Sequence, residues 1–453
     1  MLKRYKYNLP DLSNCSICII GLGYVGLPLA IEFSKVKKCL RTNKILNRKV
    51  IGFDLNKKRI KELKEGKDFT KEINYTDKQE LKKIKFISDP NANINADVFI
   101  ISVPTPTDKI NNPDLNLLKS ATASVANFIK KRDKDNSPLV ILESTVYPGT
   151  TENICIPIIE KITKYKLNKD FFFGYSPERI NPGDKTHCLT SIVKVTSGSN
   201  IEIANWIDDF YGSIIKAGTY KAKSIKVAEA AKVIENTQRD INIALVNEIA
   251  KICKSINIDT LDVLDAAESK WNFQPFRPGL VGGHCISVDP YYLTYIAKEN
   301  GYDTNIVLAG RNLNDGMSEW ITEQLFLEAD KKKIHLSNAK ILVLGLTFKE
   351  NCPDVRNSKV LDVIEILNKK EIIPHIYDPY INNTEKFNHL KFKFLNKSPF
   401  SHKIKYEIII LTVAHNEFKN INDNKWKNLL THDNYIIYDL KGIIPREIKP
   451  IRI

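Results

Sequence analysis

Residues 16–26 read Ser-Ile-Cys-Ile-Ile-Gly-Leu-Gly-Tyr-Val-Gly, an apolar run that leads directly into three glycines spaced as G-x-G-x-x-G. An apolar pattern with helical spacing follows over residues 27–33. This context is typical of a dinucleotide-binding fold, because Gly21 permits the tight turn, Gly23 lets backbone approach a pyrophosphate, and Gly26 lets helix and strand pack closely. The stretch therefore predicts a parallel α/β domain that holds phosphates over the N-terminus of its first helix.

A second apolar run, residues 49–53, ends at Asp54. An acidic residue at this position accepts hydrogen bonds from the ribose hydroxyls of an adenosine and repels a 2′-phosphate, which favours NAD over NADP. The gap between the glycines and Asp54 is longer than usual, and we attribute it to a basic, polar surface insertion over residues 35–48. Arg59 has two interpretations: a contact with the adenine or a phosphate, or a solvated helix arginine.

Three more strands are predicted at residues 97–103, 139–144 and 171–175, with helical stretches between them. This alternation describes a doubly wound parallel sheet covered on both faces. Ligands of such folds bind at the carboxyl ends of the strands. The loops that follow these strands carry Thr105, Thr145, Glu178 and Arg179. Glu178 also has a plainer interpretation, as a strand-end residue that organises its loop.

Composition and charge exclude several other classes of protein. The 453 residues are too many for one hydrophobic core, which predicts two or three domains. The formal net charge is +15, but lysines occur along nearly the whole chain, so we expect solvated surface charge and no nucleic-acid partner. No apolar run is long enough to span a membrane, and residues 1–10 lack the apolar core of a secretion signal. A cytoplasmic location without membrane contact is therefore expected.

The eight cysteines lie scattered, without the dense spacing of a disulfide framework. Cys15 and Cys18 form a C-x-x-C, but no second pair completes a metal site. We interpret them as residues of a buried strand and expect no bound metal.

Residues 224–256 contain neither proline nor glycine and predict one long helix. Lys232, Asn236 and Arg239 are spaced i, i+4 and i+7, so they share one face of that helix. One interpretation of this face is a solvated polar stripe. The other is a site that holds an oxyanion and a phosphate together.

Residues 276–290 read Phe-Arg-Pro-Gly-Leu-Val-Gly-Gly-His-Cys-Ile-Ser-Val-Asp-Pro, with glycines directly before Cys285. Glycines at this place remove side-chain bulk, so a substrate can approach the sulfur. Asp289 would stand one helical turn from the thiol if the segment enters a helix. A structural cysteine needs no such surroundings, and the segment therefore predicts that Cys285 is a reactive nucleophile.

The last third of the chain repeats the logic of the first. An apolar run at residues 340–344 ends in Gly345-Leu346-Thr347-Phe348-Lys349, and a helix-like stretch begins at Ser358. Further strands are predicted at residues 372–377, 407–412 and 435–439. The predicted fold class is thus α/β, with two doubly wound Rossmann-like domains joined by a long central helix and a small helical domain. The predicted boundaries are 1–215, 216–330 and 331–453.

The chain resembles the UDP-glucose/GDP-mannose dehydrogenase superfamily, and within it the bacterial UDP-N-acetylhexosamine 6-dehydrogenases. The resemblance rests on Gly21–Gly26, Ala231-Lys232 with Glu235-Asn236, Gly282–Asp289 and Gly345–Lys349, in fixed order. It implies an NAD-dependent four-electron oxidation of a sugar C6 to a carboxylate. Cys285 would form a thiohemiacetal and then a thioester, which keeps the aldehyde bound between the two oxidations.

The resemblance also implies roles for individual residues. The catalytic residues would be Cys285, Lys232, Asn236, Asp289, Glu178 and Thr145. The cofactor contacts would be Gly21, Gly23, Tyr24, Val25, Gly26, Asp54, Arg59, Thr105 and Thr145. The substrate contacts would be Arg179, Lys232, Asn236, Arg239, Phe276, Arg277, Gly282, Lys349 and Arg356. A solvated surface position is the plainer interpretation of Lys349. Pro182 stands where the UDP-glucose branch has a second glutamate, which puts a two-glutamate hydrolysis in doubt.

The implied substrate is a UDP-N-acetylhexosamine, with UDP-N-acetylglucosamine as the first choice and surface-polysaccharide synthesis as the purpose. UDP-N-acetylmannosamine, UDP-N-acetylgalactosamine and UDP-glucose stay open, because pocket geometry decides which hydroxyl orientation is accepted. A two-electron hydroxyacid dehydrogenase and a non-catalytic nucleotide-sugar-binding protein are the more distant alternatives. A homodimer is expected through the long helix, which has large apolar residues at Ile241, Leu245 and Ile249.

Overall fold

The computed structural model describes residues 6–68, 70, 73, 75–180, 188–283, 285–382, 384, 387–401, 403–431 and 434–453. The chain forms two compact units: the first is Met1–Glu235 with Tyr291–Gly301, and the second is Asn236–Pro290 with Tyr302–Ile453. Two helices, α6 (Ile225–Ser255) and α8 (Asp289–Glu299), have residues in both units. The predicted long helix is confirmed to within one residue at each end, whereas the bounds of the three predicted domains stay a prediction.

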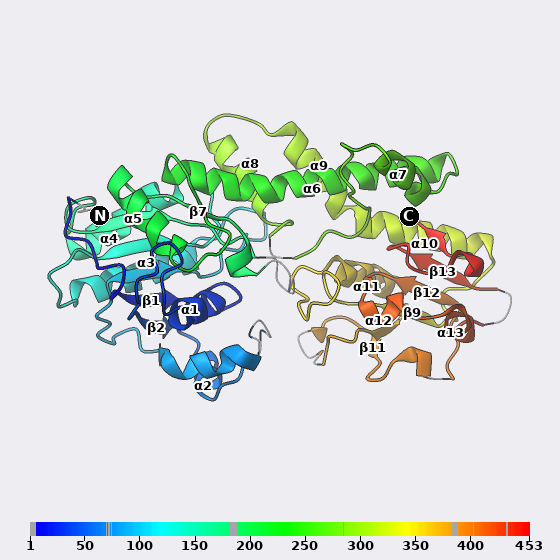
Figure 1. Cartoon of the computed structure of the whole chain (residues 1–453). Coiled ribbons are helices and arrows are strands. Elements are labelled where there is room, and N and C mark those ends of the chain that lie inside the picture. The colour runs from blue at the N-terminus through cyan, green and yellow to red at the C-terminus, as the bar shows by residue number, and fades with distance from the viewer. Residues whose placement is uncertain are drawn as a thin grey trace. The chain divides into compact units, whose positions relative to one another are not determined.

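The first unit is built on a parallel sheet with the strand order β3-β2-β1-β4-β5-β6 (Figure 1). The chain adds two strands on one side of β1 and then returns to add three on the other, so the topological switch point lies between β1 and β4. This is the predicted doubly wound arrangement. The strands are β1 (Ser16–Ile20), β2 (Lys49–Phe53), β3 (Lys85–Ile87), β4 (Val98–Ile101), β5 (Leu139–Leu142) and β6 (Phe172–Tyr175).

Different helices cover the two faces of this sheet. Ile17 and Ile19 of β1 lie in one hydrophobic core with Phe33 of α1 and residues of α5. Since neighbouring strand residues point to opposite faces, Phe99 lies on the other side, where its ring stacks with Phe128 of α3 at 6.5 Å between centroids. The helices are α1 (Gly26–Lys35), α2 (Lys57–Lys64), α3 (Asn116–Lys130), α4 (Ile156–Thr163) and α5 (Ile201–Gly212).

The insertion between α1 and β2 differs from the predicted surface loop at its last residue. Arg48 is buried, with its guanidinium 4.9 Å from the Phe210 ring centroid and 5.6 Å from that of Phe33. It also donates hydrogen bonds to Leu12 O and Ser213 Oγ, both at 2.8 Å. A planar guanidinium can stack on rings while it donates from its edge, so this arginine anchors the insertion to the core.

A small parallel sheet of β7 (Lys194–Thr196) and β8 (Thr219–Lys221) completes the first unit and has no counterpart among the predicted strands. Cys18 lies inside β1 and is buried, as the strand interpretation of the C-x-x-C predicted. Burial raises the pKa of the Cys15 thiol to about 11, so this thiol stays protonated at neutral pH.

The second unit contains a parallel sheet with the order β11-β10-β9-β12-β13-β14, the same winding as the first sheet (Figure 1). The second doubly wound domain is thereby confirmed. Its strands are β9 (Ile341–Leu344), β10 (His375–Tyr377), β11 (Lys393–Phe394), β12 (Ile408–Leu411), β13 (Ile436–Asp439) and β14 (Ile451–Arg452). Its helices, besides its parts of α6 and α8, are α7 (Thr260–Glu268), α9 (Asn305–Asp315), α10 (Met317–Lys331), α11 (Lys359–Lys369), α12 (Asn416–Lys419) and α13 (Asp423–Asn428).

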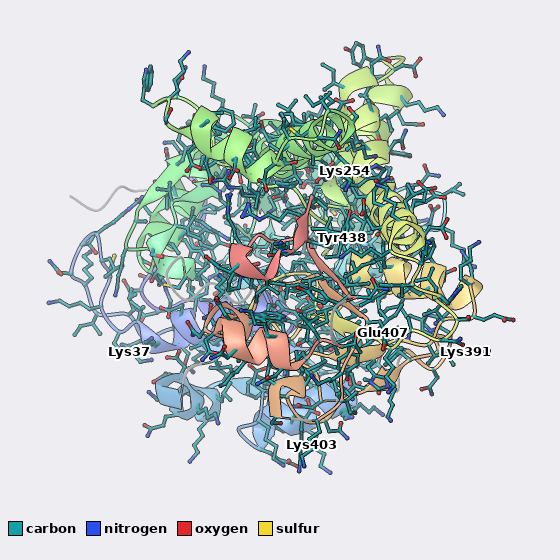
Figure 2. The ribbon with its side chains drawn as sticks, turned by 90° about the vertical axis from the view of Figure 1, so that its right-hand side faces the viewer. Lys37, Lys254, Lys391, Lys403, Glu407 and Tyr438 are labelled. Carbon is teal, nitrogen blue, oxygen red and sulfur yellow. The ribbon has the colours of Figure 1, made fainter. Side chains whose placement is uncertain are left out.

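Lysines are distributed over the surface of the second unit. Lys254, Lys391 and Lys403 lie at separate places on it, whereas Tyr438 of β13 is buried (Figure 2). This distribution fits the interpretation of the net charge as dispersed surface charge. Within the described residues, no helix combines the length and the apolar character that a membrane span requires.

Candidate active site

The glycine turn after β1 contains two glycines that the fold requires and one that it does not. A Cβ on Gly26 would lie 1.9 Å from Gly21 O, and Gly21 itself has φ +91°. A Cβ on Gly23 would meet no atom within 4 Å. Internal packing therefore does not explain Gly23, whereas a pyrophosphate lying against the backbone does. With the half-buried Tyr24 and Val25 between them, these residues fit the predicted dinucleotide.

Asp54 and Arg59 hold this turn from two sides. Asp54 accepts hydrogen bonds from Leu22 N and Asn56 N, each at 2.9 Å. An ionised carboxylate has about four acceptor positions, so ribose hydroxyls can still bind to Asp54. Arg59 is buried: its Nε donates to Leu22 O at 2.9 Å and its Nη1 pairs with Asp68 at 2.8 Å. The solvated interpretation of Arg59 is therefore wrong, because the side chain supports the turn from inside.

Thr105 and Thr145 follow the neighbouring strands β4 and β5, at the edge of the sheet where ligands bind in such folds. Thr105 Oγ1 donates to Thr145 O at 2.6 Å, which ties the two loops together. Tyr292, in the part of α8 that belongs to the first unit, donates its hydroxyl to Thr105 O at 2.7 Å. The structure thus joins two of the residues that the sequence assigned to the cofactor.

Glu178 follows β6 and is nearly buried. Its Oε1 accepts from the backbone N–H groups of Arg179 and Ile180 at 2.6 and 2.7 Å. The Arg179 side chain forms a two-point ion pair with Glu235 of α6, at 2.9 and 3.2 Å. Glu178 therefore organises its own loop, as the plainer interpretation expected. Its other oxygen, Oε2, lies 3.5 Å from Lys194 Nζ. Pro182 lies outside the described residues.

Lys232 is on α6, in the part that belongs to the first unit, and only 7% of its surface is exposed. Within the described part of the chain, its ammonium has no hydrogen-bond or ion-pair partner. An ammonium removed from water is costly unless a negative group compensates it, so Lys232 suits an oxyanion from a ligand. Asn236 is also buried and Arg239 is exposed. The solvated-stripe interpretation is thus wrong for the first two residues and fits only the third.

Asn236, Asp289 and Cys285 come together in the second unit. Asn236 Nδ2 donates to Asp289 Oδ2 at 2.5 Å, and Arg239 donates to Asn236 Oδ1 at 3.2 Å. Asp289 N donates to Cys285 O at 2.9 Å, where α8 begins. Cys285 is half-buried. The predicted spacing of thiol and carboxylate, one helical turn apart, is therefore present, while His284 lies outside the described residues.

The glycines before Cys285 serve the packing of the chain itself. A Cβ on Gly282 would lie 2.5 Å from Asn357 O, and one on Gly283 would lie 2.8 Å from the Phe348 ring. Asn357 Nδ2 also donates to Gly283 O at 3.2 Å. The expectation that these two glycines leave space for a substrate is wrong, because the connection between β9 and α11 fills that space.

The other predicted substrate residues have partners in the second unit. Arg277 is exposed and pairs with two carboxylates of α7 at 2.5 and 2.7 Å. Arg356 pairs with the carboxylate two positions before it at 2.6 Å. The Lys349 ammonium lies 5.4 Å from the Phe348 ring centroid, and Phe276 is half-buried. These contacts do not test the substrate roles, which stay predictions.

The turn after β9 differs from the glycine turn of the first unit. Gly345 has φ +97°, but Thr347 and Glu350 stand where the first unit has its second and third glycines. Asp378 is buried and accepts hydrogen bonds from two backbone N–H groups of this turn, at 2.6 and 3.0 Å. His415 Nε2 lies 3.1 Å from the same carboxylate oxygen. Asp378 is therefore buried and has His415 as a further partner, whereas Asp54 after β2 is only half-buried.

Sequence reasoning missed the partners of several of these residues. Lys194 Nζ lies 2.8 Å from Glu143 and 3.5 Å from Glu178, and all three are buried. Lysine is so common in this chain that nothing in the sequence distinguished Lys194 from the lysines of the surface. Glu143 did carry one, since an acidic residue at the end of a buried apolar strand needs a partner.

Three domain models of one family match the chain in order. They describe the NAD binding domain at residues 15–215, the central domain at 226–316 and the UDP binding domain at 342–446 of the UDP-glucose/GDP-mannose dehydrogenase family. The chain is also 48% identical over 442 residues to UDP-N-acetyl-D-glucosamine 6-dehydrogenase of Pseudomonas aeruginosa, which covers 98% of this chain and 100% of that protein. The chain belongs to the UDP-glucose/GDP-mannose dehydrogenase family.

As a member of this family it is an NAD-dependent nucleotide-sugar dehydrogenase, which confirms the predicted family and cofactor. It is 46% identical over 431 residues to Protein CapL of Staphylococcus aureus, covering 95% of this chain and 96% of that one. Among solved structures, UDP-D-ManNAc dehydrogenase from Pyrococcus horikoshii is similar with a TM-score of 0.83 at 30% identity, covering 96% of this chain and 98% of that one.

Proposed function

We propose that this dehydrogenase oxidises C6 of UDP-N-acetylglucosamine to the carboxylate, with Cys285 as the covalent carrier between two hydride transfers. The observation that carries the proposal is the half-buried Cys285 one helical turn before Asp289, whose carboxylate is bound by Asn236. A thiol beside an oriented carboxylate and amide is suited to attack on an aldehyde and to later hydrolysis. A dehydrogenase that stops at the aldehyde has no use for this thiol.

The first half of the reaction converts the alcohol to a bound aldehyde. Two NAD⁺ molecules, bound one after the other, would each accept one hydride. Lys232 stabilises the negative oxygen that forms when the C6 hydroxyl loses its proton to water, since this lysine is nearly buried and its ammonium has no partner among the described residues. The Cys285 thiolate then adds to the aldehyde carbon, and the oxygen takes a proton to give a thiohemiacetal.

The second half converts this adduct to the acid. Loss of a hydride and a proton leaves a thioester on Cys285. A water molecule attacks its carbon while a carboxylate accepts the proton, the C–S bond breaks, and the sulfur regains a proton as the uronate leaves. Asn236 donates to the tetrahedral oxyanion, and Asp289 with Glu178 positions and activates the water. Thr145 lies at the strand end next to that of Glu178.

The choice of sugar follows the degree of similarity. The relative named for UDP-N-acetyl-D-glucosamine is 48% identical, whereas the solved UDP-D-ManNAc dehydrogenase is 30% identical. UDP-N-acetylmannosamine, UDP-N-acetylgalactosamine and UDP-glucose are the alternatives. We assign the product to surface-polysaccharide synthesis, as the family resemblance implies.

The test is the yield of NADH per sugar across these four UDP-sugars, measured with purified protein and limiting sugar. We expect two NADH per molecule of UDP-N-acetylglucosamine and an acidic product. A yield of one NADH contradicts the covalent scheme. Full activity on another sugar, and none on UDP-N-acetylglucosamine, contradicts the substrate assignment alone.

The protein is further proposed to act as a cytoplasmic homodimer with the three domains 1–215, 216–330 and 331–453. Support for the dimer comes from α6, on which Leu245 is 54% exposed and Ile252 continues the same stripe, followed by Ile256 directly after the helix. Ile241 and Ile249, on neighbouring turns, are half-buried. Leu245→Lys is expected to shift the sedimentation coefficient towards that of a monomer, and an unchanged dimer would place the interface elsewhere.

A further inference from the structure

Behind Glu178 lies an enclosed cluster of ionisable side chains from four segments of the first unit. Glu178 follows β6, Glu143 follows β5, Lys194 begins β7 and Tyr211 is in α5. Glu178 is 8% exposed, and the other three are at most 2% exposed. Charges this deep are costly unless they are paired and hydrogen-bonded, so their arrangement calls for an explanation beyond packing.

The contacts within the cluster form a chain that ends at Glu178. Tyr211 donates its hydroxyl to Glu143 Oε1. Lys194 Nζ lies 2.8 Å from Glu143 Oε2 and 3.5 Å from Glu178 Oε2. Glu178 Oε1 is held separately by two backbone N–H groups. Both oxygens of Glu178 are thus oriented, one by its own loop and one by Lys194.

The charges of the cluster are shared between two carboxylates and one ammonium. Burial acts to lower the pKa of Lys194, but the two carboxylates outweigh it and raise that pKa, so Lys194 stays charged. Burial raises the pKa of Glu143, which Lys194 and the Tyr211 hydroxyl counteract. A second ionisable pair near Glu178 is Arg179 with Glu235. The Arg179 guanidinium donates to Glu235 and to Val193 O.

We propose that Lys194, with Glu143 behind it, is a positioning residue that orients Glu178 and balances its charge for hydrolysis of the Cys285 thioester. The inference rests on the proposed function, since Glu178 is needed only if a thioester must be hydrolysed. Lys194 alone would hold Glu178 firmly but make it a weak base. Glu143 compensates the ammonium, so Glu178 is held in place and still accepts a proton from water.

The two partners therefore have opposite electrostatic effects on Glu178. Replacement of Lys194 by methionine removes the positive charge beside the Glu178 carboxylate, so the acid limb of the hydrolysis rate moves to higher pH. Replacement of Glu143 by glutamine leaves the ammonium uncompensated and moves the same limb to lower pH. If Lys194 and Glu143 served only as hydrogen-bonding or packing partners, the two replacements would not shift the pH profile of hydrolysis in opposite directions.

The experiment measures hydrolysis directly in single turnover with the full-length protein, NAD⁺ and UDP-N-acetylglucosamine. NADH is followed by absorbance, and the adduct on Cys285 is followed by intact-protein mass spectrometry, from pH 5.5 to 9. For both K194M and E143Q we expect a normal release of two NADH per active site followed by slow decay of the thioester. The decay should be about tenfold to a hundredfold slower than in the natural protein, the lower part of the range for one acid–base group.

Lys134→Met is the matched control, because Lys134 also pairs with a buried carboxylate, that of Asp97 at 2.7 Å, before β4 at the opposite end of the same sheet. It should leave the decay and its pH profile unchanged. If the pH profiles of K194M and E143Q shift in the same direction, or do not shift, the role of Lys194 and Glu143 is overturned. If K194M does not fold, a shift of the E143Q profile to lower pH supports the role, and any other result overturns it. A yield of one NADH per sugar in the natural protein overturns the proposed function instead.

Discussion

Asn236 Nδ2 donates a hydrogen bond to Asp289 Oδ2 at 2.5 Å, and both side chains are buried. This contact orients the amide, since its oxygen accepts from Arg239 at 3.2 Å. The second hydrogen on Nδ2 can then donate to an oxyanion on the carbon attached to Cys285.

Asn236→Ala removes this donor and is expected to lower kcat by about a hundredfold or more. The KM for UDP-sugar should change much less, because the oxyanion forms only during the reaction. Steady-state kinetics test this. Gln238→Ala, which removes an exposed amide from the same helix, is the control. A variant of Asn236 with normal kcat would exclude it from the oxyanion site.

Cys285→Ala should abolish uronate formation, because no thiohemiacetal can form. NAD⁺ binding should persist, since the glycine turn and Asp54 belong to the first unit and Cys285 to the second. The measurements are product analysis by chromatography and NAD⁺ titration by calorimetry. Uronate at the normal rate would eliminate the thioester scheme.

Gly23→Ala and Gly26→Ala should separate cofactor binding from folding. A Cβ on Gly23 meets no protein atom within 4 Å, so this variant should keep its stability and lose NAD⁺ affinity. A Cβ on Gly26 would lie 1.9 Å from Gly21 O, so that variant should lose about 1–3 kcal/mol of unfolding free energy or more. Urea unfolding and NAD⁺ titration check the pair. Normal NAD⁺ affinity in Gly23→Ala would contradict the proposed pyrophosphate position.

Glu229 of α6 makes stability depend on pH. Burial raises its pKa from 4.5 to about 7, although Gly149 N and Thr151 N donate to its carboxylate. The native state keeps the proton in a range where the unfolded chain has lost it, so stability falls as pH rises from about 4.5 to about 7. The loss from this group is about 3 kcal/mol.

Glu229→Gln cannot ionise and should remove this part of the pH dependence. We therefore expect the natural protein to lose about 3 kcal/mol relative to the variant between pH 4.5 and 7.5, measured by urea unfolding. The variant can be less stable at every pH, because its amide nitrogen replaces one of the two Glu229 oxygens that accept from Gly149 N and Thr151 N. A constant difference between the two proteins across this range would contradict the raised pKa.

Much of the fold was predictable because its signals are local. The apolar run before Gly21 and the helical spacing after it predicted β1 and α1, and the absence of proline and glycine predicted α6. The two-residue and three-residue strands β3, β7, β8, β11 and β14 were missed. Segments so short have too few residues for a periodic pattern, and neighbouring strands decide whether they pair.

The candidate site was predictable only where its residues form a motif of consecutive positions in the sequence. The glycines before Cys285 identified the segment, but the reason for them was misjudged, because Phe348 and Asn357 fill the space. For Arg59 the sequence left a cofactor contact and a solvated position open, and it could not show the ion pair with Asp68 that excludes the solvated position.

The sequence alone determined the winding of both sheets, the glycine turn, the acid after β2 and the helix that carries Lys232 and Asn236. These depend on backbone conformation and on spacing along one element, which consecutive residues control. The tertiary structure decided which side chains support them: Asp289 with Asn236, Glu143 and Lys194 with Glu178, and Asn357 with Gly283. Such partners come from separate loops that meet only after strands far apart in the chain have paired. Their charges and hydrogen bonds therefore follow from the folded arrangement.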